Sequence, residues 1–245
     1  MKAIDSRQIN YYFNRLLGKR RGGPIVLHRY KAVYFPIPKV ACSSVTKFCA
    51  NLLDMKEGPD TDIHKLYYPS LDVNKTGRCD RYFKFAFVRN PWDRVLSCYS
   101  NKILQDPSIT NTYYKNGIAN SFVKYDGVFT AGMPFNEFVH IIKDWPDQTA
   151  DPHFRSQHTY LENKDGDLVV DYIGHFESLA DDFDYVVSKL NVPQKMLPHL
   201  KKSVHNNYWN SYDEDLIQVV GERYARDIEL FGYDFIPTKV NNVNV

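Results

Sequence analysis

Short apolar runs that are rich in β-branched and aromatic residues, and that end at polar or turn-forming residues, predict strands. Such runs lie at residues 25–27, 33–35, 83–88 and 169–173. Apolar residues that recur every three or four positions predict helices instead. That spacing is found at residues 4–17, 43–53, 91–104, 134–143 and 179–190.

The last part of the chain keeps one helical pattern from Leu216 to Phe231, and Gly232 fits the position at which helices often stop. Ser178 is placed to cap the helix predicted at 179–190. Strands that alternate with helices predict a three-layer α/β fold with a mostly parallel central sheet and helices on both faces.

The strand at 33–35 passes into its helix through a segment of small and hydroxyl residues, within the sequence YFPIPKVACSSVTK. We call residues 36–46 the first junction. Its small residues let the backbone curl around an anion, and a helix N-terminus attracts negative charge. Lys39 can reach the same anion as a mobile point charge. Taken alone, an ordinary strand-to-helix turn explains this segment equally well, and it lacks the glycine pattern of a Walker A loop.

The strand at 83–88 leads into a second such segment, within FKFAFVRNPWDRVLSCY, and we call residues 89–97 the second junction. Asn90 is a good helix cap and Pro91 suits the first helical position. Arg89 then lies at the carboxyl end of a strand, where open α/β sheets bind ligands. Arg89 offers a planar fork to a phosphate, and Ser97 offers a hydroxyl two helical turns along the same face. We expect Arg94 to be a surface or ion-pairing residue.

Two junctions, each with a cation and hydroxyls, suit a nucleotide that carries separate 5′ and 3′ anions. The residues here also carry a resemblance. PKVACSSVTK resembles the 5′-phosphosulfate loop of Golgi carbohydrate sulfotransferases, and FKFAFVRNPWDRVLSCYSNKI resembles their 3′-phosphate segment. The resemblance is to the chondroitin and dermatan 4-sulfotransferase and HNK-1 sulfotransferase group, and to bacterial members of the superfamily. It continues in order through FNEFVHII, DPHFRSQHTYL, VDYIGHFESLADDFDYV and YDEDLIQVVGERYARDIELFGYDF.

This resemblance implies a P-loop-like sulfotransferase fold and a PAPS-dependent enzyme. It would transfer the sulfuryl group of 3′-phosphoadenylyl sulfate (PAPS) to a carbohydrate hydroxyl by in-line displacement. Lys39 would stabilise the bridging oxygen, and Arg89 and Ser97 would hold the 3′-phosphate. The residues implied to hold the 5′-phosphate and sulfuryl oxygens are Ala41, Cys42, Ser43, Ser44, Val45 and Thr46. By position alone, a late basic loop adds Lys201, Lys202 and Ser203 as candidates for the 3′-phosphate and adenine, although a plain solvated loop fits them equally well.

Two histidines match the resembling group by position, and histidine suits proton transfer near neutral pH. His64 lies between the two junctions in sequence, and we expect it to be the base that accepts the acceptor's proton. His153, in DPHFRSQ, is expected to bind the acceptor beside it. A sulfuryl group carries less charge than a terminal phosphoryl group, so no metal is expected.

Residues 106–133 lack clean periodicity and contain many aromatic residues. These rings could stack on a sugar, or they could pack as an excursion that covers the active site; the second interpretation is favoured because aromatic residues make up 15% of the chain. Either way, a long irregular segment often forms a lid or binding loop, so we expect it to influence acceptor choice. The rings are those of Tyr113, Tyr114, Phe122, Tyr125 and Phe129.

Length and composition agree with one sulfotransferase domain at 1–245, since 245 residues with 43% hydrophobic content can bury a large core. We expect a cofactor core at about 25–105, acceptor and lid elements at about 106–212, and a C-terminal helix at about 213–231. A net charge of +2 gives no indication of nucleic-acid binding. The expected partner is a carbohydrate acceptor.

The N-terminal residues are too polar for a signal peptide, and no apolar run approaches the length of a membrane span. The cysteines show no zinc-binding spacing, so thiols in a reducing cytosol are the simplest account. We therefore expect a soluble, cytoplasmic protein without a membrane span. The four cysteines are Cys42, Cys49, Cys79 and Cys98.

Two other classes of function remain open. A nucleotide-dependent kinase with an atypical phosphate loop would also use strand-to-helix junctions, but it should show P-loop glycines and magnesium ligands, and neither is visible. A non-catalytic nucleotide- or glycan-binding module would be expected to have lost Lys39 or the histidine base, and both are present.

Overall fold

The computed structural model describes residues 19–20, 22–55, 58, 62–71, 79–192 and 207–236. The helix predicted at 4–17 and the candidates Lys201, Lys202 and Ser203 lie outside these residues. Within the described ranges, no helix is long and apolar enough to cross a membrane.

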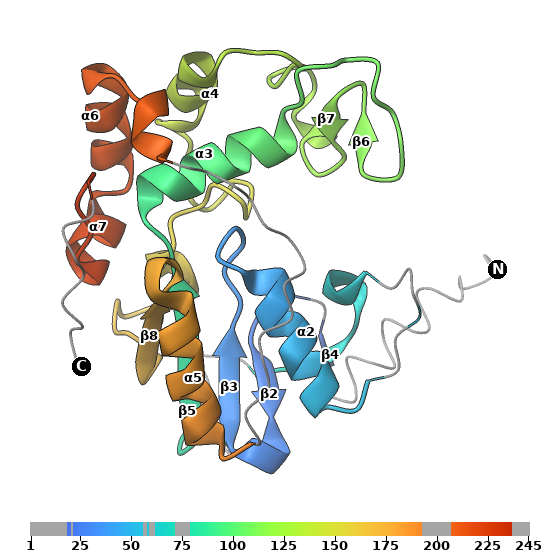
Figure 1. The fold of residues 1–245 in the computed structure, drawn as a ribbon, viewed down its shortest axis with the longest axis vertical. Helices are drawn as coiled ribbons and strands as arrows, with labels where there is room; N and C mark the ends of the chain where they lie inside the picture. Colours follow the sequence, from blue (N-terminus) through green and yellow to red (C-terminus); the bar gives the residue numbers. More distant parts are fainter. Residues whose placement is uncertain are drawn as a thin grey trace.

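A four-stranded sheet forms the centre of the lower half of the molecule (Figure 1). Its strand order is β2-β3-β5-β8; β2 and β3 are antiparallel, whereas β3, β5 and β8 run parallel. The prediction of an α/β fold with a mostly parallel sheet is therefore confirmed. The strands are β2 (Ile25–Leu27), β3 (Ala32–Phe35), β5 (Phe83–Val88) and β8 (Tyr172–His175).

The strand predicted at 169–173 was placed too early, because β8 begins only at Tyr172. The preceding residues pair with a different segment: Val169 donates its N–H to the carbonyl of Leu161, and Leu168 forms a bridge with Glu162. Two small antiparallel pairs lie outside the main sheet. They join β1 (Lys19–Arg20) to β4 (Tyr68–Pro69) and β6 (Tyr114–Lys115) to β7 (Ile118–Ala119).

The helices agree with the prediction to within about two residues except at the C-terminal end. There the single predicted helix is broken at Tyr224, whose φ of −115° is not helical and whose buried hydroxyl donates to the carbonyl of Phe154 at 2.6 Å. Gly232, at φ 67°, ends the second piece as predicted. The helices are α2 (Cys42–Leu52), α3 (Pro91–Lys102), α4 (Phe135–Ile142), α5 (Leu179–Leu190), α6 (Glu214–Arg223) and α7 (Ala225–Phe231).

Short 3₁₀ helices occupy several connections, at His28–Tyr30, Ile63–Lys65, Val123–Tyr125, His158–Tyr160, Phe176–Ser178 and Tyr208–Ser211. The expected cap of α5 is wrong in its chemistry. Ser178 stands at the N-cap position, but its hydroxyl donates to Asp182 at 2.7 Å instead of accepting from a backbone N–H.

The buried apolar side chains form two clusters. The first joins the sheet to α2 and α5, and the rings of Phe48 and Phe183 lie 4.9 Å apart, so both helices cover the same face. The second cluster joins α3, α4 and α6 to residues 106–133 in the upper half of the molecule (Figure 1). Phe122 and Phe129 are buried in it, at 1% and 5% exposure, so these two rings pack in the core and do not offer a sugar-stacking surface.

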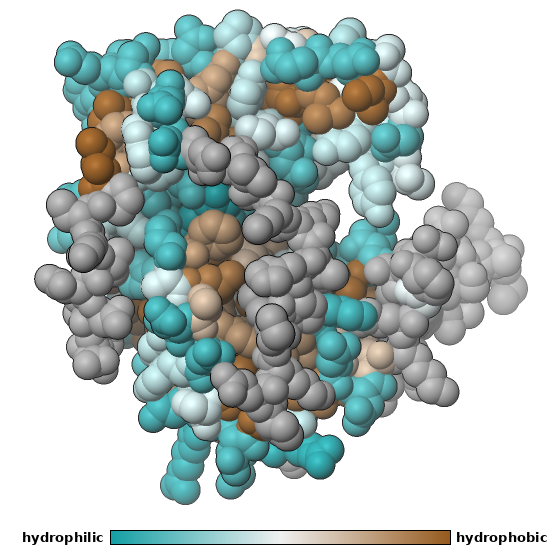
Figure 2. Space-filling model, in the orientation of Figure 1, coloured by the Kyte–Doolittle hydropathy of each residue, from teal (hydrophilic) through white to brown (hydrophobic). Residues whose placement is uncertain are grey.

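The outer surface of residues 106–133 keeps some apolar character. Figure 2 shows apolar side chains over the region of β6 and β7. Val123 and Val128 of this segment are exposed. Tyr113, at 65% exposure, is the candidate ring from this segment that remains most open to solvent. The prediction that the segment packs as an excursion is therefore confirmed for its two buried phenylalanines.

Candidate active site

The first junction turns through unusual backbone conformations between β3 and α2. Lys39 and Ala41 have φ values of 71° and 47°, in the left-handed region that residues with a side chain seldom adopt. Ala41 is the N-cap of α2, and its carbonyl accepts hydrogen bonds from the N–H groups of Ser44 and Val45. Alanine has no side-chain oxygen to cap the helix. A helix N-terminus without a side-chain cap suits an anion, and anion binding at this turn stays a prediction.

The side chain of Lys39 lies in a partly buried, positively charged environment. Burial and the nearby cations Lys102 and Arg89 lower the pKa of Lys39 to about 8. The ammonium is therefore mainly protonated at neutral pH, and it is a stronger acid than an ordinary lysine. Both properties suit a group that stabilises charge on a leaving oxygen.

The structure brings His64 to the first junction. His64 lies in the 3₁₀ helix Ile63–Lys65, and its Nε2 is 2.9 Å from the hydroxyl oxygen of Ser43, in the first turn of α2. The carboxylate of Asp62 accepts a hydrogen bond from the backbone N–H of His64 at 3.1 Å, which fixes the start of this short helix. His64 remains exposed to solvent.

The remaining first-junction candidates differ in accessibility. Cys42 and Ser43 are partly exposed, whereas Ser44, Val45 and Thr46 are buried in α2. Within the described part of the chain, the hydroxyl of Thr46 has no hydrogen-bond partner. The accessible part of the junction is therefore its turn and the first residues of the helix.

At the second junction, Asn90 caps α3 as predicted, because its Oδ1 accepts the N–H of Trp92 at 3.1 Å. Pro91 is the first helical residue. Arg89 and Ser97 are both 2% exposed, so the predicted 3′-phosphate residues lie deep in the protein.

The guanidinium of Arg89 already has protein partners. Its Nε and Nη2 donate to Oδ2 of Asp93, both at 2.8 Å, and its Nη1 donates to the carbonyl of Lys39 at 3.1 Å. The ring of Phe176 lies 4.1 Å from the guanidinium carbon. Among the described residues, these bonds engage three of the five N–H groups of the arginine. They also connect the two junctions directly.

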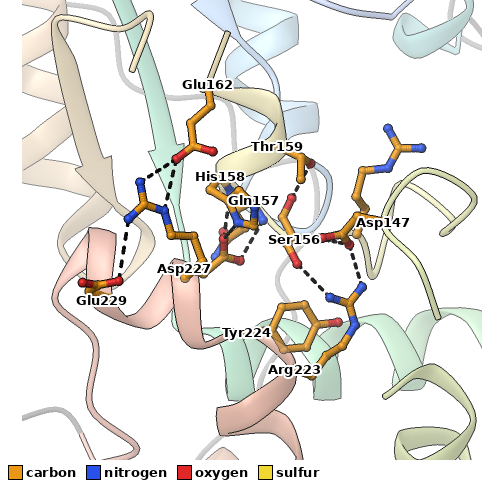
Figure 3. A network of polar contacts seen from close by, with 12 residues as sticks. Asp147, Ser156, Gln157, His158, Thr159, Glu162, Arg223, Tyr224, Asp227 and Glu229 are labelled. Carbon is orange, nitrogen blue, oxygen red and sulfur yellow. Dashed lines mark hydrogen bonds and ion pairs between the residues drawn. The ribbon is translucent and has the colours of Figure 1, made fainter. Parts of the chain in front are cut away.

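Sequence reasoning missed the residue that holds the backbone of Arg89. The buried side chain of Gln157 accepts the N–H of Arg89 at 2.9 Å and donates to its carbonyl at 2.8 Å. The carboxylate of Asp227 in α7 in turn accepts three hydrogen bonds (Figure 3). Two come from the backbone N–H groups of Gln157 and His158, and the third comes from Nδ1 of the His158 ring. One signal was present in the sequence: Asp227 is a carboxylate on the otherwise apolar face of the last helix.

A second histidine lies close to a buried carboxylate. The Nδ1 of His153 is 2.5 Å from Oδ1 of Asp151, and the other oxygen of Asp151 is 3.5 Å from the ammonium of Lys124. Burial lowers the pKa of His153 to about 4, with Lys102 and Lys39 contributing, so the ring is neutral at physiological pH. In the neutral tautomer that donates to Asp151, Nε2 is an acceptor.

The expectation for Arg94 is wrong. Arg94 is 1% exposed, and its partners are backbone carbonyls: Nε donates to Pro38 at 3.0 Å, Nη1 to Arg155 at 2.7 Å and Nη2 to Pro152 at 3.2 Å. The helical pattern alone could not reveal this, because the partners come from two loops that are distant in sequence. Among the described residues, no group of three or more histidine, cysteine or acidic side chains could hold a metal ion.

Known proteins resemble this chain in sequence. A sequence model described as the sulfotransferase family matches residues 24–234. The chain is 28% identical over 236 residues to carbohydrate sulfotransferase 10 of Gallus gallus, a match that covers 85% of this chain and 65% of the relative. It is 30% identical over 185 residues to carbohydrate sulfotransferase 10 of Xenopus laevis, which covers 68% of this chain and 51% of the relative.

A third relative is carbohydrate sulfotransferase 14 of Danio rerio, which is 25% identical over 232 residues, with 85% of this chain and 61% of the relative covered. The matches thus span between about half and two thirds of these relatives' length. No solved structure matches the chain.

Proposed function

Because the chain belongs to the sulfotransferase family, we propose that it transfers the sulfuryl group of PAPS to a hydroxyl of a carbohydrate. One observation carries the proposal: Arg89 of the second junction donates to the carbonyl of Lys39 in the first, at 3.1 Å. Two anion-binding junctions in direct contact suit a single nucleotide with anionic groups at both 5′ and 3′ positions.

In this proposal the first junction holds the 5′-phosphate and the sulfuryl group. The N–H groups at the start of α2 face the anion, and Lys39 adds a positive charge. The guanidinium of Arg89 and the hydroxyl of Ser97 bind the 3′-phosphate. Asp93 orients the guanidinium, and Gln157 fixes the backbone that carries it.

The reaction is a displacement at sulfur. The acceptor hydroxyl oxygen forms a bond to sulfur while the bond between sulfur and the bridging oxygen breaks, and the electron pair stays on the 5′-phosphate that leaves. His64 takes the proton of the hydroxyl, since its ring lies beside Ser43 at the sulfuryl end of the junction. The Lys39 ammonium stabilises the charge that develops on the bridging oxygen.

His153 has a different role in the proposal. Its neutral ring, held by Asp151, presents Nε2 as a hydrogen-bond acceptor. The charge of Lys39 helps to lower the pKa of this ring and so to keep it neutral. It therefore binds a hydroxyl of the acceptor next to the reacting group. The relatives named carbohydrate sulfotransferases support a sugar as that acceptor.

Calorimetry with adenosine 3′,5′-bisphosphate, AMP and ATP, all without magnesium, tests the nucleotide part of this proposal. We expect the bisphosphate to bind at least about 100-fold more tightly than AMP, because charged hydrogen bonds to a buried phosphate are each worth roughly 1.5–3 kcal/mol. Equal affinity for AMP and the bisphosphate, or a preference for ATP, would contradict it. Labelled PAPS with a panel of oligosaccharides then identifies the acceptor.

A further inference from the structure

Lys39 occupies a backbone conformation that the chain does not adopt without support. A left-handed φ costs a residue with a side chain on the order of 1–2 kcal/mol, and the φ of Lys39 is 71°. Such strain persists only where the surrounding structure fixes the backbone on both sides.

Two arginines of the second junction hold the peptide groups on either side of Lys39. Arg94 donates Nε to the carbonyl of Pro38 at 3.0 Å, and Arg89 donates Nη1 to the carbonyl of Lys39 at 3.1 Å. Both arginines are at most 2% exposed. A charged donor to a buried carbonyl forms a strong hydrogen bond, so these contacts fix the direction in which the Lys39 side chain leaves the backbone.

The same guanidinium of Arg94 also reaches the loop that carries His153. Its Nη1 donates to Arg155 at 2.7 Å and its Nη2 to Pro152 at 3.2 Å, so its bonds lie on both sides of His153 in the sequence. Among the described residues, no ion pair involves Arg94. A planar fork can hold three carbonyls at once, which the single ammonium of a lysine cannot do with the same geometry.

We propose that Arg94 is a positioning residue: it fixes the Lys39 backbone and the His153 loop relative to each other and so aims the Lys39 ammonium at the reacting group. This inference rests on the proposed sulfuryl transfer, because Lys39 has a catalytic role only in that reaction. Arg94 itself touches neither donor nor acceptor. Its effect must therefore pass through the residues that it holds.

A double-mutant cycle between Arg94 and Lys39 tests this role. The variants are Arg94→Lys, Lys39→Ala and the two combined, assayed with labelled PAPS and the best acceptor found, or with water as acceptor. We expect Arg94→Lys to lower kcat about 10- to 100-fold and to leave the KM for PAPS within about threefold, because small misplacements of a catalytic group are costly. In the Lys39→Ala background, Arg94→Lys should lower kcat by less than about threefold.

The inference is overturned if Arg94→Lys lowers kcat by the same factor in the wild-type and Lys39→Ala backgrounds. It is also overturned if Arg94→Lys changes only the KM for PAPS. Should Arg94→Lys fail to fold, Arg94→Met replaces it, since an apolar side chain of similar length avoids a buried unpaired ammonium. Tyr212→Phe is the control: it removes a 2.7 Å side-chain hydrogen bond to a backbone carbonyl, that of Trp92 in α3, and should leave kcat unchanged.

Measurements on the wild-type protein distinguish a failure of the proposed function from a failure of the proposed role of Arg94. If this protein neither binds adenosine 3′,5′-bisphosphate nor releases sulfate from PAPS, the proposed function is wrong and the role of Arg94 falls with it. If it does both and the cycle is additive, only the positioning role of Arg94 is wrong.

Discussion

At the first junction the chain turns through left-handed residues into an uncapped helix, whereas at the second it enters a helix that Asn90 caps in the ordinary way. The candidate side chains of the two junctions also differ in solvent exposure. His64 at the first junction is exposed, but Arg89 and Ser97 at the second are 2% exposed. The first junction thus has an unusual backbone conformation, whereas the second has an ordinary backbone and a deeply buried arginine.

This difference follows from what each junction has to do in the proposed reaction. The first must adapt to a group that changes bonding, so its polar side chains need room to move. The second only has to hold an unchanging phosphate, so a rigid, buried arginine with Asp93 and Gln157 around it serves well. Changes at the first junction should therefore affect turnover, and changes to Arg89 and Ser97 should affect affinity and stability. Arg94 differs from these two, because it holds the backbone of Lys39.

The largest expected effect comes from the two histidines. His64→Ala should lower kcat by roughly 10²–10⁴-fold, because it removes the proposed base, and it should leave PAPS affinity nearly intact. His153→Ala should instead raise the acceptor KM with a smaller loss of kcat. Steady-state kinetics with acceptor varied at saturating PAPS distinguishes the two.

The opposite result for the two histidine variants would assign the role of the base to His153. If His153→Ala abolishes turnover while His64→Ala stays active, then the Asp151–His153 pair removes the proton. Asp151→Asn is then the matching change, since it removes the carboxylate that accepts from Nδ1 at 2.5 Å.

The next effect concerns affinity at the second junction. Arg89→Ala should weaken adenosine 3′,5′-bisphosphate binding by about 2–3 kcal/mol, or roughly 30- to 150-fold, and leave AMP binding nearly unchanged. Removing Arg89 also leaves the Asp93 carboxylate buried without its partner, which should destabilise the fold. Calorimetry and thermal unfolding together measure both effects.

Arg89→Ala combined with Asp93→Asn is the control for that experiment. It should recover part of the lost stability, because no buried charge is left unpaired, without recovering bisphosphate affinity. If the double variant binds the bisphosphate as tightly as the wild type, Arg89 does not bind the 3′-phosphate.

The pH dependence of turnover sharpens the description of the first junction. Burial, with Lys102 and Arg89 nearby, lowers the pKa of Lys39 to about 8. The protonated form is the active one, so kcat/KM should fall about tenfold per pH unit above pH 8. In Lys39→Arg the side chain stays charged, so this limb should disappear even though the maximal rate is lower. A limb that persists unchanged in this variant belongs to another group.

The elements of the fold were largely predictable because they depend on local pattern. Apolar periodicity located most helices, and Asn90 and Gly232 marked their ends correctly. The exceptions have non-local causes: Tyr224 breaks the last helix where its hydroxyl reaches Phe154, and residues before β8 pair with 161–162.

The candidate site shows the same division. Its two junctions were visible as sequence segments, and the structure places His64 and the carbonyl of Lys39 within hydrogen-bond distance of Ser43 and Arg89, respectively. Gln157 and Arg94 were not identified, because each acts through backbone groups more than fifty residues away. Backbone carbonyls carry no sequence signature, so a buried side chain that binds them is seen only in three dimensions.

The smallest expected effect is on the stability of the support behind the second junction. Burial tends to lower the pKa of His158, but the hydrogen bond to Asp227 and the charge of that carboxylate outweigh burial and raise this pKa. The folded state thus holds this proton more strongly than the unfolded chain, whose histidine titrates near pH 6.5. The stabilisation is complete below that pH and is lost as pH rises through the raised value.

His158→Asn should therefore lower the free energy of unfolding by roughly 1–2 kcal/mol at pH 5.5 and by less at pH 9, measured by urea denaturation. A deficit that stays constant over this range would show that His158 contributes packing alone, and that the charge of Asp227 is balanced by the N–H groups of Gln157 and His158 without the imidazolium.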